Sequence, residues 1–312
     1  MTRPTVYSPR STAARAFAFA SFGAFASFVY AEHVVHPERA VPAERVHANS
    51  VQATRIISLV PALTEMVFAI GASDRVIAVS SYDDYPMQVR TLPKVGALID
   101  PDVERIIALR PDLVLLYGSQ TDLITQLSRA SIPYFAYRHG GLAAVTATIR
   151  SLGQRTGHTQ QADALASDID RRLTTLRQRA AALVTPRTLL VFGREGGSLR
   201  NIYASGGRGF LHDILEAAGG VNVFADVPTE SVQASSEMIL SRAPDVIIEI
   251  RSTDIPSEPQ RAAEIATWKL LASVPAVRSG RIYLLSGRAI GVPGPRVAES
   301  AEQMAALLHP RP

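Results

Sequence analysis

The sequence predicts an α/β fold of two parallel-sheet, Rossmann-like lobes joined by one long rigid helix. Three observations predict this fold. Strand-like and helix-like segments alternate along residues 54–312, one long amphipathic helix interrupts them, and patterns in the first half recur in the second. Strands that alternate with helices indicate parallel βαβ units. A chain of 312 residues is long enough to bury two modest cores.

Residues 1–31 have the pattern of a secretory signal peptide. Three arginines precede an apolar run at residues 16–31, and its last three residues, Val-Tyr-Ala, fit a small-x-small cleavage site. The run is shorter than the about 20 residues of a membrane span. We therefore expect export with cleavage near Ala31, with an uncleaved anchor as the alternative. Residues 32–53, which contain three histidines, are expected to form a flexible linker.

The composition excludes several classes of protein. The hydrophobic content of 47% and the charged content of 19% are typical of a globular chain. The net charge of +4 comes without a dense run of Lys and Arg, so nucleic-acid binding has little support. Because the chain has no cysteine, no disulfide stabilises the fold and no lipid can be attached through a cysteine at the cleavage site.

Residues 54–140 are expected to form an N-terminal α/β lobe. Buried-strand patterns alternate here with helical patterns, and proline or glycine marks several boundaries, as Pro61 and Gly71 do. The expected strands cover residues 55–60, 75–80, 112–117 and 133–137. The expected helices cover residues 62–70, 102–109 and 122–130.

Residues 141–185 are expected to connect the lobes through a helix at 142–154 and a longer one at 159–183. In the longer segment apolar residues recur every three or four positions and make a single face. Thr159 is expected to cap its N-terminus. About 25 residues at 1.5 Å each span about 40 Å, more than the width of a small domain. This length favours a strut between lobes over a surface helix within one domain.

Residues 186–312 are expected to form a C-terminal α/β lobe. The expected strands cover residues 187–192, 245–250 and 281–285, and the expected helices cover 210–218, 235–242 and 295–308. Residues 193–209 are rich in glycine and are expected to form a loop. Its SGGRGF run could hold an anion at a helix N-terminus; a tight connection into the helix is the alternative.

The two halves of the chain repeat two patterns in the same order. VERIIALRPDLVLLY at 103–117 and SEMILSRAPDVIIEI at 236–250 align without a gap. Each contains a glutamate, Glu104 or Glu237, followed by Pro-Asp and an apolar strand. LTEMVFAIG and LHDILEAAG form the second pair. Two pairs in the same order indicate two similarly built lobes.

The motifs of common catalytic centres are absent. The sequence has no G-x-S-x-G elbow, no Walker A lysine loop and no H-E-x-x-H. His139 follows an expected strand, where a parallel sheet places its ligands, but a three-histidine metal site is not supported. No nucleophile and base stand out as a pair. We therefore expect neither an enzyme nor a bound metal or cofactor; an exported α/β enzyme using Asp83, Asp84 and His139 is the less favoured alternative.

One long block of the N-terminal half resembles a known family. RIISLVPALTEMVFAIGASDRVIAVSSYDDYP, followed by LPKVGALIDPDVERIIALRPDLVLLY, is similar to the periplasmic substrate-binding proteins of ABC importers for cobalamin, haem and ferric siderophores. The resemblance covers residues 54–309, and VIAVSSYDDYP makes the cobalamin-binding branch the closest. It implies a monomeric periplasmic protein that captures a corrinoid in an inter-lobe cleft and delivers it to the transmembrane subunits of an importer.

The resemblance also implies residue roles. Pro61, Tyr82 and Tyr117 match positions that line the cleft. Leu98 and Tyr117 stand where that branch has tryptophans, and Arg288 stands roughly where an acidic cleft residue is seen. The candidate ligand-binding residues are Pro61, Tyr82, Tyr85, Leu98, Tyr117, His139 and Arg288.

Glu104 and Glu237 match two glutamates of the family that meet arginines of the transmembrane subunits. They are therefore the candidate permease-docking residues. A carboxylate in the first turn of a helix can also simply stabilise that helix, which is the structural alternative.

The identity of the ligand stays open among three classes. A corrinoid or porphyrin is a large, mostly apolar disc that would stack on aromatic and aliphatic side chains. Haem would also need an iron ligand, for which the candidates are Tyr82, Tyr85, Tyr117 and His139. An anionic siderophore would need several arginines, for which the candidates are Arg138, Arg194 and Arg288. A binding module that signals to a receptor is a further alternative.

Overall fold

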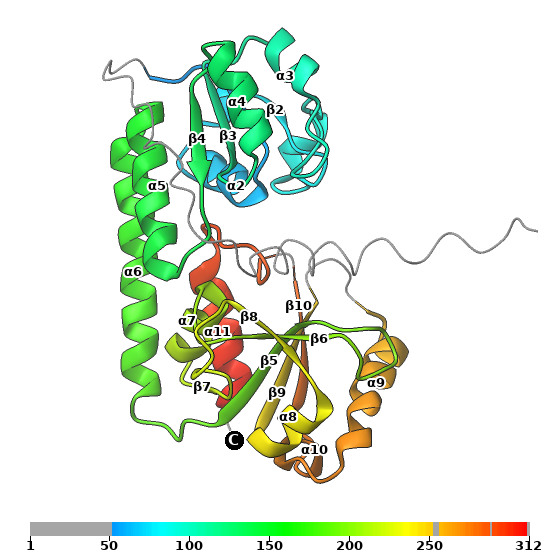
Figure 1. Cartoon of the computed structure of the whole chain (residues 1–312). Coiled ribbons are helices and arrows are strands. Elements are labelled where there is room, and N and C mark those ends of the chain that lie inside the picture. Colours follow the sequence, from blue (N-terminus) through cyan, green and yellow to red (C-terminus); the bar gives the residue numbers. More distant parts are fainter. Residues whose placement is uncertain (1–51, 252–255, 288, 311–312) are drawn as a thin grey trace, which may run out of the picture.

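The computed structural model describes residues 52–251, 256–287 and 289–310. The expected signal peptide, nearly all of the expected linker, and Arg288 lie outside these residues. The chain forms a four-stranded sheet in the order β2-β1-β3-β4 and a six-stranded sheet in the order β10-β9-β5-β6-β8, where β7 also pairs with β5. Figure 1 shows the two sheets one above the other, with α5 and α6 at their side. The predicted α/β class is confirmed.

The first sheet and its helices, called here the N-terminal lobe, are built from parallel strands. The strands are β1 (Ile56–Ser58), β2 (Val76–Val79), β3 (Leu113–Tyr117) and β4 (Tyr134–Tyr137). The helices are α2 (Pro61–Ala69), η1 (Ser73–Arg75), η2 (Met87–Thr91), α3 (Val103–Ala108) and α4 (Thr121–Arg129). All three strand pairings are parallel, so the four strands end at the same edge of the sheet. The strands β1 and β3 are almost wholly buried, as expected for a parallel sheet covered on both faces.

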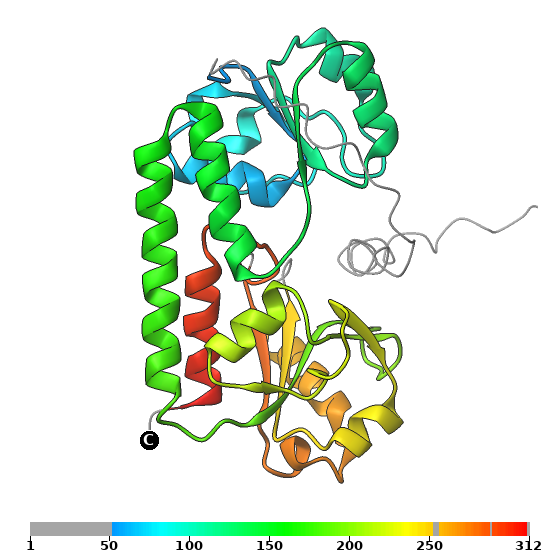
Figure 2. The same ribbon diagram turned by 60° about the vertical axis from the view of Figure 1, so that its left-hand side comes forward.

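The chain passes from the first sheet to the second through α5 (Leu142–Thr156) and α6 (Thr159–Ala180). Gly157 adopts a left-handed conformation with φ of 66°, which ends α5 and reverses the chain. The expected N-cap at Thr159 is wrong, because His158 holds the cap position and Thr159 begins the helix. The 22 residues of α6 span about 33 Å. Figure 2 shows α6 running beside both lobes.

The second sheet and its helices form the C-terminal lobe. Its strands are β5 (Arg187–Gly193), β6 (Ile202–Ser205), β7 (Val221–Asn222), β8 (Ser231–Ala234), β9 (Val246–Arg251) and β10 (Ile282–Ser286). Its helices are α7 (Phe210–Ala217), α8 (Ser236–Arg242), α9 (Glu258–Thr267), η3 (Trp268–Leu271), α10 (Pro275–Arg278) and α11 (Val297–Leu308). The strands β7, β9 and β10 pair in parallel, whereas β6 pairs antiparallel with both β5 and β8.

The glycine-rich segment 193–209 is therefore not a loop throughout, because it contains β6. The connection from β5 to β6 is short, and a parallel return would need a crossover of about a dozen residues or more. An antiparallel pairing is the one that this short connection allows. The sheet of the C-terminal lobe is consequently mixed, although a parallel one was expected.

The repeated sequence pattern corresponds to the same set of hydrogen bonds in the two lobes. Asp112 accepts a hydrogen bond from the backbone N–H of Arg55 at 2.8 Å, and Asp245 accepts one from that of Arg187 at 3.1 Å. Each arginine in turn donates to a backbone carbonyl at the end of α3 or α8. In both lobes the Pro-Asp unit thus fastens a helix and its strand to the start of the neighbouring strand.

One hydrophobic cluster extends through both lobes and the connecting helices. It contains buried side chains of α2, α5, α6, α7 and α11, among them Leu63, Ile149, Ile169, Ile214 and Met304. Because the packing is continuous, the lobes are fastened to α5 and α6 as well as connected through them. No helix within the described parts of the chain is both long enough and apolar enough to cross a membrane.

Candidate functional site

Most of the candidate ligand-binding residues lie where the strands of the N-terminal lobe end. Pro61 follows β1, Tyr82 and Tyr85 follow β2, Tyr117 is the last residue of β3, and His139 follows β4. Since the four strands are parallel, these positions lie along one edge of the sheet (Figure 1). In open α/β sheets ligands bind outside this edge. We call these residues, together with Leu98, the strand-end site.

An aromatic cluster forms the part of the site at β3 and β4. The ring centroids of Tyr117 and His139 are 5.4 Å apart, those of Tyr137 and His139 are 5.3 Å apart, and those of the two tyrosines are 6.0 Å apart. These distances are within the range of favourable aromatic pairs. Tyr137 was not among the predicted residues, although its position two residues before His139 on an expected strand is a usable signal.

Burial raises the pKa of the Tyr117 phenol well above its ordinary value, and the nearby charge of Asp83 raises it further. Burial likewise raises the pKa of Tyr137, with Tyr117 and Glu230 adding to the shift. Both phenols are therefore neutral at physiological pH. Neutral rings suit stacking against an apolar face, whereas a phenolate that ligates iron would have to form against this environment.

Gln120, at the start of α4, ties Leu98 to the end of β3. Its Oε1 accepts a hydrogen bond from the backbone N–H of Tyr117 at 3.0 Å, and its Nε2 donates to the carbonyl of Leu98 at 3.2 Å. Gln120 is buried, and Leu98 is half-buried. No local sequence pattern pointed to Gln120, because its partner Leu98 is 22 positions away.

Large apolar side chains are exposed on the loops after β2. The exposed fractions are 43% for Tyr82, 41% for Tyr85, 71% for Met87 and 59% for Ile99. The two loop segments are held together by a hydrogen bond from the N–H of Ser81 to the carbonyl of Gly96, at 2.8 Å. Exposed apolar groups that gather in one region indicate a binding surface. Met87 and Ile99 were not predicted, because a single apolar residue in a loop carries no periodicity.

Asp83 anchors the loop that carries Tyr82 and Tyr85. Its side chain is only 3% exposed, and its Oδ2 accepts a hydrogen bond from the N–H of Ser80 at 2.9 Å. The Lys94 ammonium donates to the Asp83 carbonyl at 2.7 Å. Burial raises the pKa of Asp83 to about 6, although hydrogen bonds and the charge of Lys94 act in the opposite direction. This carboxyl group faces into the protein, which suits a structural role.

Tyr85 contacts an arginine of the other lobe. The guanidinium carbon of Arg296 lies 3.9 Å from the centre of the Tyr85 ring. Arg296 also makes two hydrogen bonds to Glu65 of α2, at 2.9 and 2.6 Å. Neither Glu65 nor Arg296 was selected from the sequence, because they are 231 positions apart.

Two of the three arginines considered for an anionic siderophore lie within the described residues, and one of these two is already paired. Arg194 has a side chain that is 0% exposed, and it is paired with Glu249 and Glu264 inside the C-terminal lobe. Its charge is therefore already compensated by protein carboxylates. Arg138 is exposed, and Arg288 lies outside the described residues.

The two candidate docking glutamates are exposed and occupy equivalent positions. Glu104 lies in the first turn of α3, and Glu237 lies in the first turn of α8. The N-caps of these helices are other residues: Asp102 accepts from the N–H of Arg105 at 3.0 Å, and Ser235 accepts from that of Met238 at 3.2 Å. The N-cap bonds are thus made by other residues, although Glu237 also hydrogen-bonds the Ser235 side chain, which lowers the pKa of its carboxyl group.

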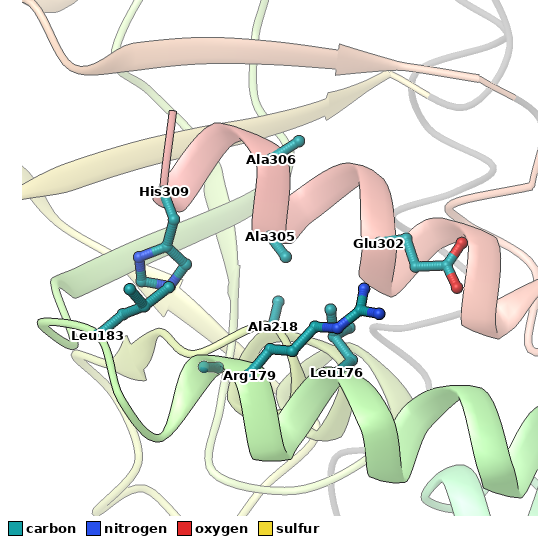
Figure 3. A pocket seen from close by; sticks show the side chains of 9 residues that line it. Leu176, Arg179, Leu183, Ala218, Glu302, Ala305, Ala306 and His309 are labelled. Carbon is teal, nitrogen blue, oxygen red and sulfur yellow. The ribbon is translucent and has the colours of Figure 1, made fainter. Parts of the chain in front are cut away.

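A pocket of about 480 Å³ lies away from the strand-end site, between α6 and α11 (Figure 3). It is lined by Leu176, Arg179, Ala180, Leu183, Ala218, Glu302, Ala305, Ala306 and His309. None of the predicted ligand-binding residues lines it. The described residues also contain no group of three or more His, Cys, Asp or Glu that could hold a metal ion.

Comparison with known proteins places this geometry in a family. Residues 56–289 match a family described as periplasmic binding protein. A vitamin B12-binding protein of Yersinia pestis (strain Pestoides F) is 34% identical over 198 residues, covering 63% of this chain and 69% of the relative. Two solved structures are similar as well. The periplasmic vitamin B12 binding protein BtuF of Vibrio cholerae is 27% identical, with a TM-score of 0.69 over 82% of this chain and 96% of its own.

A periplasmic heme binding protein from Pseudomonas aeruginosa is 25% identical, with a TM-score of 0.71 over 83% of this chain and 93% of its own. The names of these relatives describe binding proteins for vitamin B12 and heme, so the expectation of a binding protein is confirmed. The chain belongs to the periplasmic binding protein family.

Proposed function

We propose that this protein captures cobalamin at the strand-end site, in a cleft between the lobes, and delivers it to an ABC importer. The observation that carries the proposal is the set of exposed apolar side chains on the same lobe as the partly buried aromatic cluster of Tyr117, Tyr137 and His139. Such a surface suits a large disc with apolar faces. The 34% identity to a vitamin B12-binding protein supports the same ligand class.

Haem is the second candidate ligand, because a heme binding protein is among the similar structures. It would need an iron ligand from the strand-end site. The raised pKa of Tyr117 disfavours its phenolate, which leaves Tyr82, Tyr85 and His139 for that role. A ferric siderophore is less supported, because Arg194 is occupied by Glu249 and Glu264.

The proposal also assigns a role to each segment of the chain. We propose that residues 1–31 direct export and are removed near Ala31, and that residues 32–53 link the mature N-terminus to the first lobe. Residues 54–140 and 186–312 would then be the two lobes and 141–185 their connection. The protein would act as a monomer in the periplasm.

Replacing Tyr82 or Tyr117 with alanine is expected to weaken cobalamin binding by about 1–3 kcal/mol, the value of a lost stacking contact and its buried area. This loss corresponds to an increase in Kd of about 5-fold to more than 100-fold. Isothermal titration of each purified variant measures it, and the melting temperature identifies a variant that fails through misfolding.

Arg179→Ala is the matched control, because Arg179 lines the pocket between α6 and α11 and should leave the cobalamin Kd unchanged. If the wild-type protein shows no cobalamin binding but binds haem tightly, the cobalamin assignment is wrong and haem replaces it.

Replacing Glu104 and Glu237 with glutamine together is expected to reduce uptake and association with the importer, more than either single change. Two carboxylates at equivalent places on two lobes suit a two-fold symmetric pair of transmembrane subunits, each offering an arginine. Ligand affinity and melting temperature should hardly change, because Asp102 and Ser235 cap the two helices. Transport assays in cells measure the effect, and normal uptake by the double variant would refute the docking role.

A further inference from the structure

A single arginine contacts both an acidic side chain and an aromatic side chain of the other lobe. Arg296 immediately precedes α11 of the C-terminal lobe, whereas Glu65 belongs to α2 and Tyr85 to the loop after β2 in the N-terminal lobe. The Nε and Nη2 atoms of Arg296 donate to the two carboxylate oxygens of Glu65, at 2.9 and 2.6 Å. One edge of the guanidinium, formed by Nε and Nη2, meets both oxygens of one carboxylate, so the direction of the guanidinium plane is fixed.

The surroundings hold this ion pair in place. The Glu65 side chain is 4% exposed and that of Arg296 is 20% exposed. The backbone before Arg296 lies next to α2, because a Cβ added at Gly294 would be in ordinary van der Waals contact with Oε2 of Glu65, at 3.4 Å, and with the carbonyl of Ala62, at 3.8 Å. A bidentate pair whose carboxylate is buried has few alternative orientations, and it connects the C-terminal lobe to α2.

The face of the same guanidinium holds the ring of Tyr85. The guanidinium carbon is 3.9 Å from the ring centre, well inside the distance at which a cation attracts an aromatic face. The Tyr85 side chain is nevertheless 41% exposed, so part of the ring is open to a ligand. The orientation of a candidate ligand-binding residue of one lobe therefore depends on an arginine of the other.

We propose that Arg296 is a positioning residue: anchored by Glu65, it sets the orientation of the Tyr85 ring at the rim of the strand-end site and so couples that ring to the arrangement of the two lobes. This inference rests on the proposed function in taking Tyr85 as a ligand-binding residue. A shift of one lobe relative to the other moves the guanidinium and releases the ring, so the ring is preorganised only while the lobes keep this arrangement.

The first test uses the ligand-free protein labelled with fluorotyrosine and observed by fluorine NMR, with the Tyr85 signal assigned by Tyr85→Phe. Arg296→Lys keeps the charge but loses the two-pronged contact and the planar face. It is expected to shift or broaden the Tyr85 signal. Arg172→Lys is the matched control, since Arg172 makes an equally two-pronged contact with Glu302 at 2.9 and 2.7 Å on α6 and α11. An unchanged Tyr85 signal in Arg296→Lys would overturn the positioning role, whatever ligand the protein binds.

The second test is a double-mutant cycle in cobalamin affinity, built from Arg296→Lys, Tyr85→Ala and their combination. Each single change is expected to raise the Kd by about threefold to tenfold, the scale of one partly exposed cation–ring contact. The combined variant should bind no more weakly than Tyr85→Ala alone, because Arg296 acts through that ring. Effects that multiply would overturn the inference.

Glu65→Gln removes the carboxylate partner of Arg296 and leaves the arginine unchanged. This variant replaces Arg296→Lys in both tests if Arg296→Lys lowers the melting temperature strongly. It is expected to move the Tyr85 signal and the Kd in the same direction as Arg296→Lys. Absence of cobalamin binding by the wild-type protein would refute the proposed function alone, since the NMR test decides the positioning of Tyr85 without a ligand.

Discussion

Replacing Glu249 with leucine is expected to lower the free energy of unfolding by about 3–5 kcal/mol, the scale of breaking a buried ion pair. Glu249 is 1% exposed in the middle of β9, and its Oε2 accepts from Nε of Arg194 at 3.0 Å. The indole N–H of Trp268 donates to the same oxygen at 3.1 Å. Arg251 pairs with the other oxygen of the carboxylate.

The loss is expected to be large because the remaining charges no longer balance. Arg194 is 0% exposed and, together with Arg251, would keep the carboxylate of Glu264 as the one charged partner among the described residues. Water does not reach a fully buried guanidinium, so its desolvation stays uncompensated. Urea denaturation at neutral pH, with equal slopes for wild type and variant, measures the difference.

Two further variants make this prediction specific. Glu302→Leu removes an exposed carboxylate whose contact with Arg172 is similarly two-pronged, and it should cost at most about 1 kcal/mol. Combining Arg194→Met with Glu249→Leu removes one charge of each sign and should be more stable than Glu249→Leu alone. A loss below about 1 kcal/mol for Glu249→Leu would show that the buried charges are compensated in another way.

The fold was predictable where local patterns and tertiary structure agree. Each strand of the N-terminal lobe is a short apolar run preceded or followed by proline, glycine or a polar turn, and parallel strands are buried on both faces. The strands β6 and β8 did not follow this rule. They lie in polar or glycine-rich segments, and their pairing depends on each other, as with Ala204 and Val232, more than on their own composition.

Of the candidate site, only the residues at the strand ends could be selected from the sequence. Residues at or just after the end of a strand, such as Tyr117 and His139, can be selected because ligands bind at the carboxyl edge of a parallel sheet. The residues that contact and support these candidate residues could not be identified from the sequence. Arg296 and Gln120 act on partners 231 and 22 positions away, and no local pattern encodes such contacts.

Arg194 is a residue that the sequence suggested as an anion ligand and that tertiary contacts make unavailable. A sequence presents it as an arginine after a strand, which suits an anion site. Its partners Glu249 and Glu264 lie 55 and 70 positions away. Whether an arginine is available to a ligand is thus decided by tertiary contacts.

Replacing Asp83 with asparagine is expected to change the pH dependence of stability by about 2–3 kcal/mol between pH 4 and pH 8. Burial raises the pKa of Asp83 to about 6 in the folded protein, whereas an unfolded Asp has a pKa of about 3.9. Between these two pKa values Asp83 is mostly protonated in the folded state and mostly ionised in the unfolded state. Through this group the wild-type protein therefore loses stability as the pH rises from about 4 to about 6. A shift of about two units at about 1.4 kcal/mol per unit gives the expected size.

The asparagine variant has no proton to lose at this position. It keeps an oxygen that can accept from the N–H of Ser80, as Oδ2 of Asp83 does at 2.9 Å. The variant should therefore gain stability relative to wild type as the pH rises, and the gain should level off above about pH 7. Urea denaturation of both proteins at several pH values measures this difference, in which the other titrating groups largely cancel.

Asp226→Asn provides a control of opposite sign. The hydrogen bond and charge of Arg242 lower the pKa of the exposed Asp226 carboxyl group. Its contribution to stability is therefore present above its unfolded pKa and is lost as the pH falls. Relative to wild type, Asp226→Asn should lose stability as the pH rises, while Asp83→Asn gains it. A stability difference between Asp83→Asn and wild type that stays constant from pH 4 to pH 8 would mean that Asp83 titrates normally. The loop that carries Tyr82 and Tyr85 would then not be anchored by a buried carboxyl group.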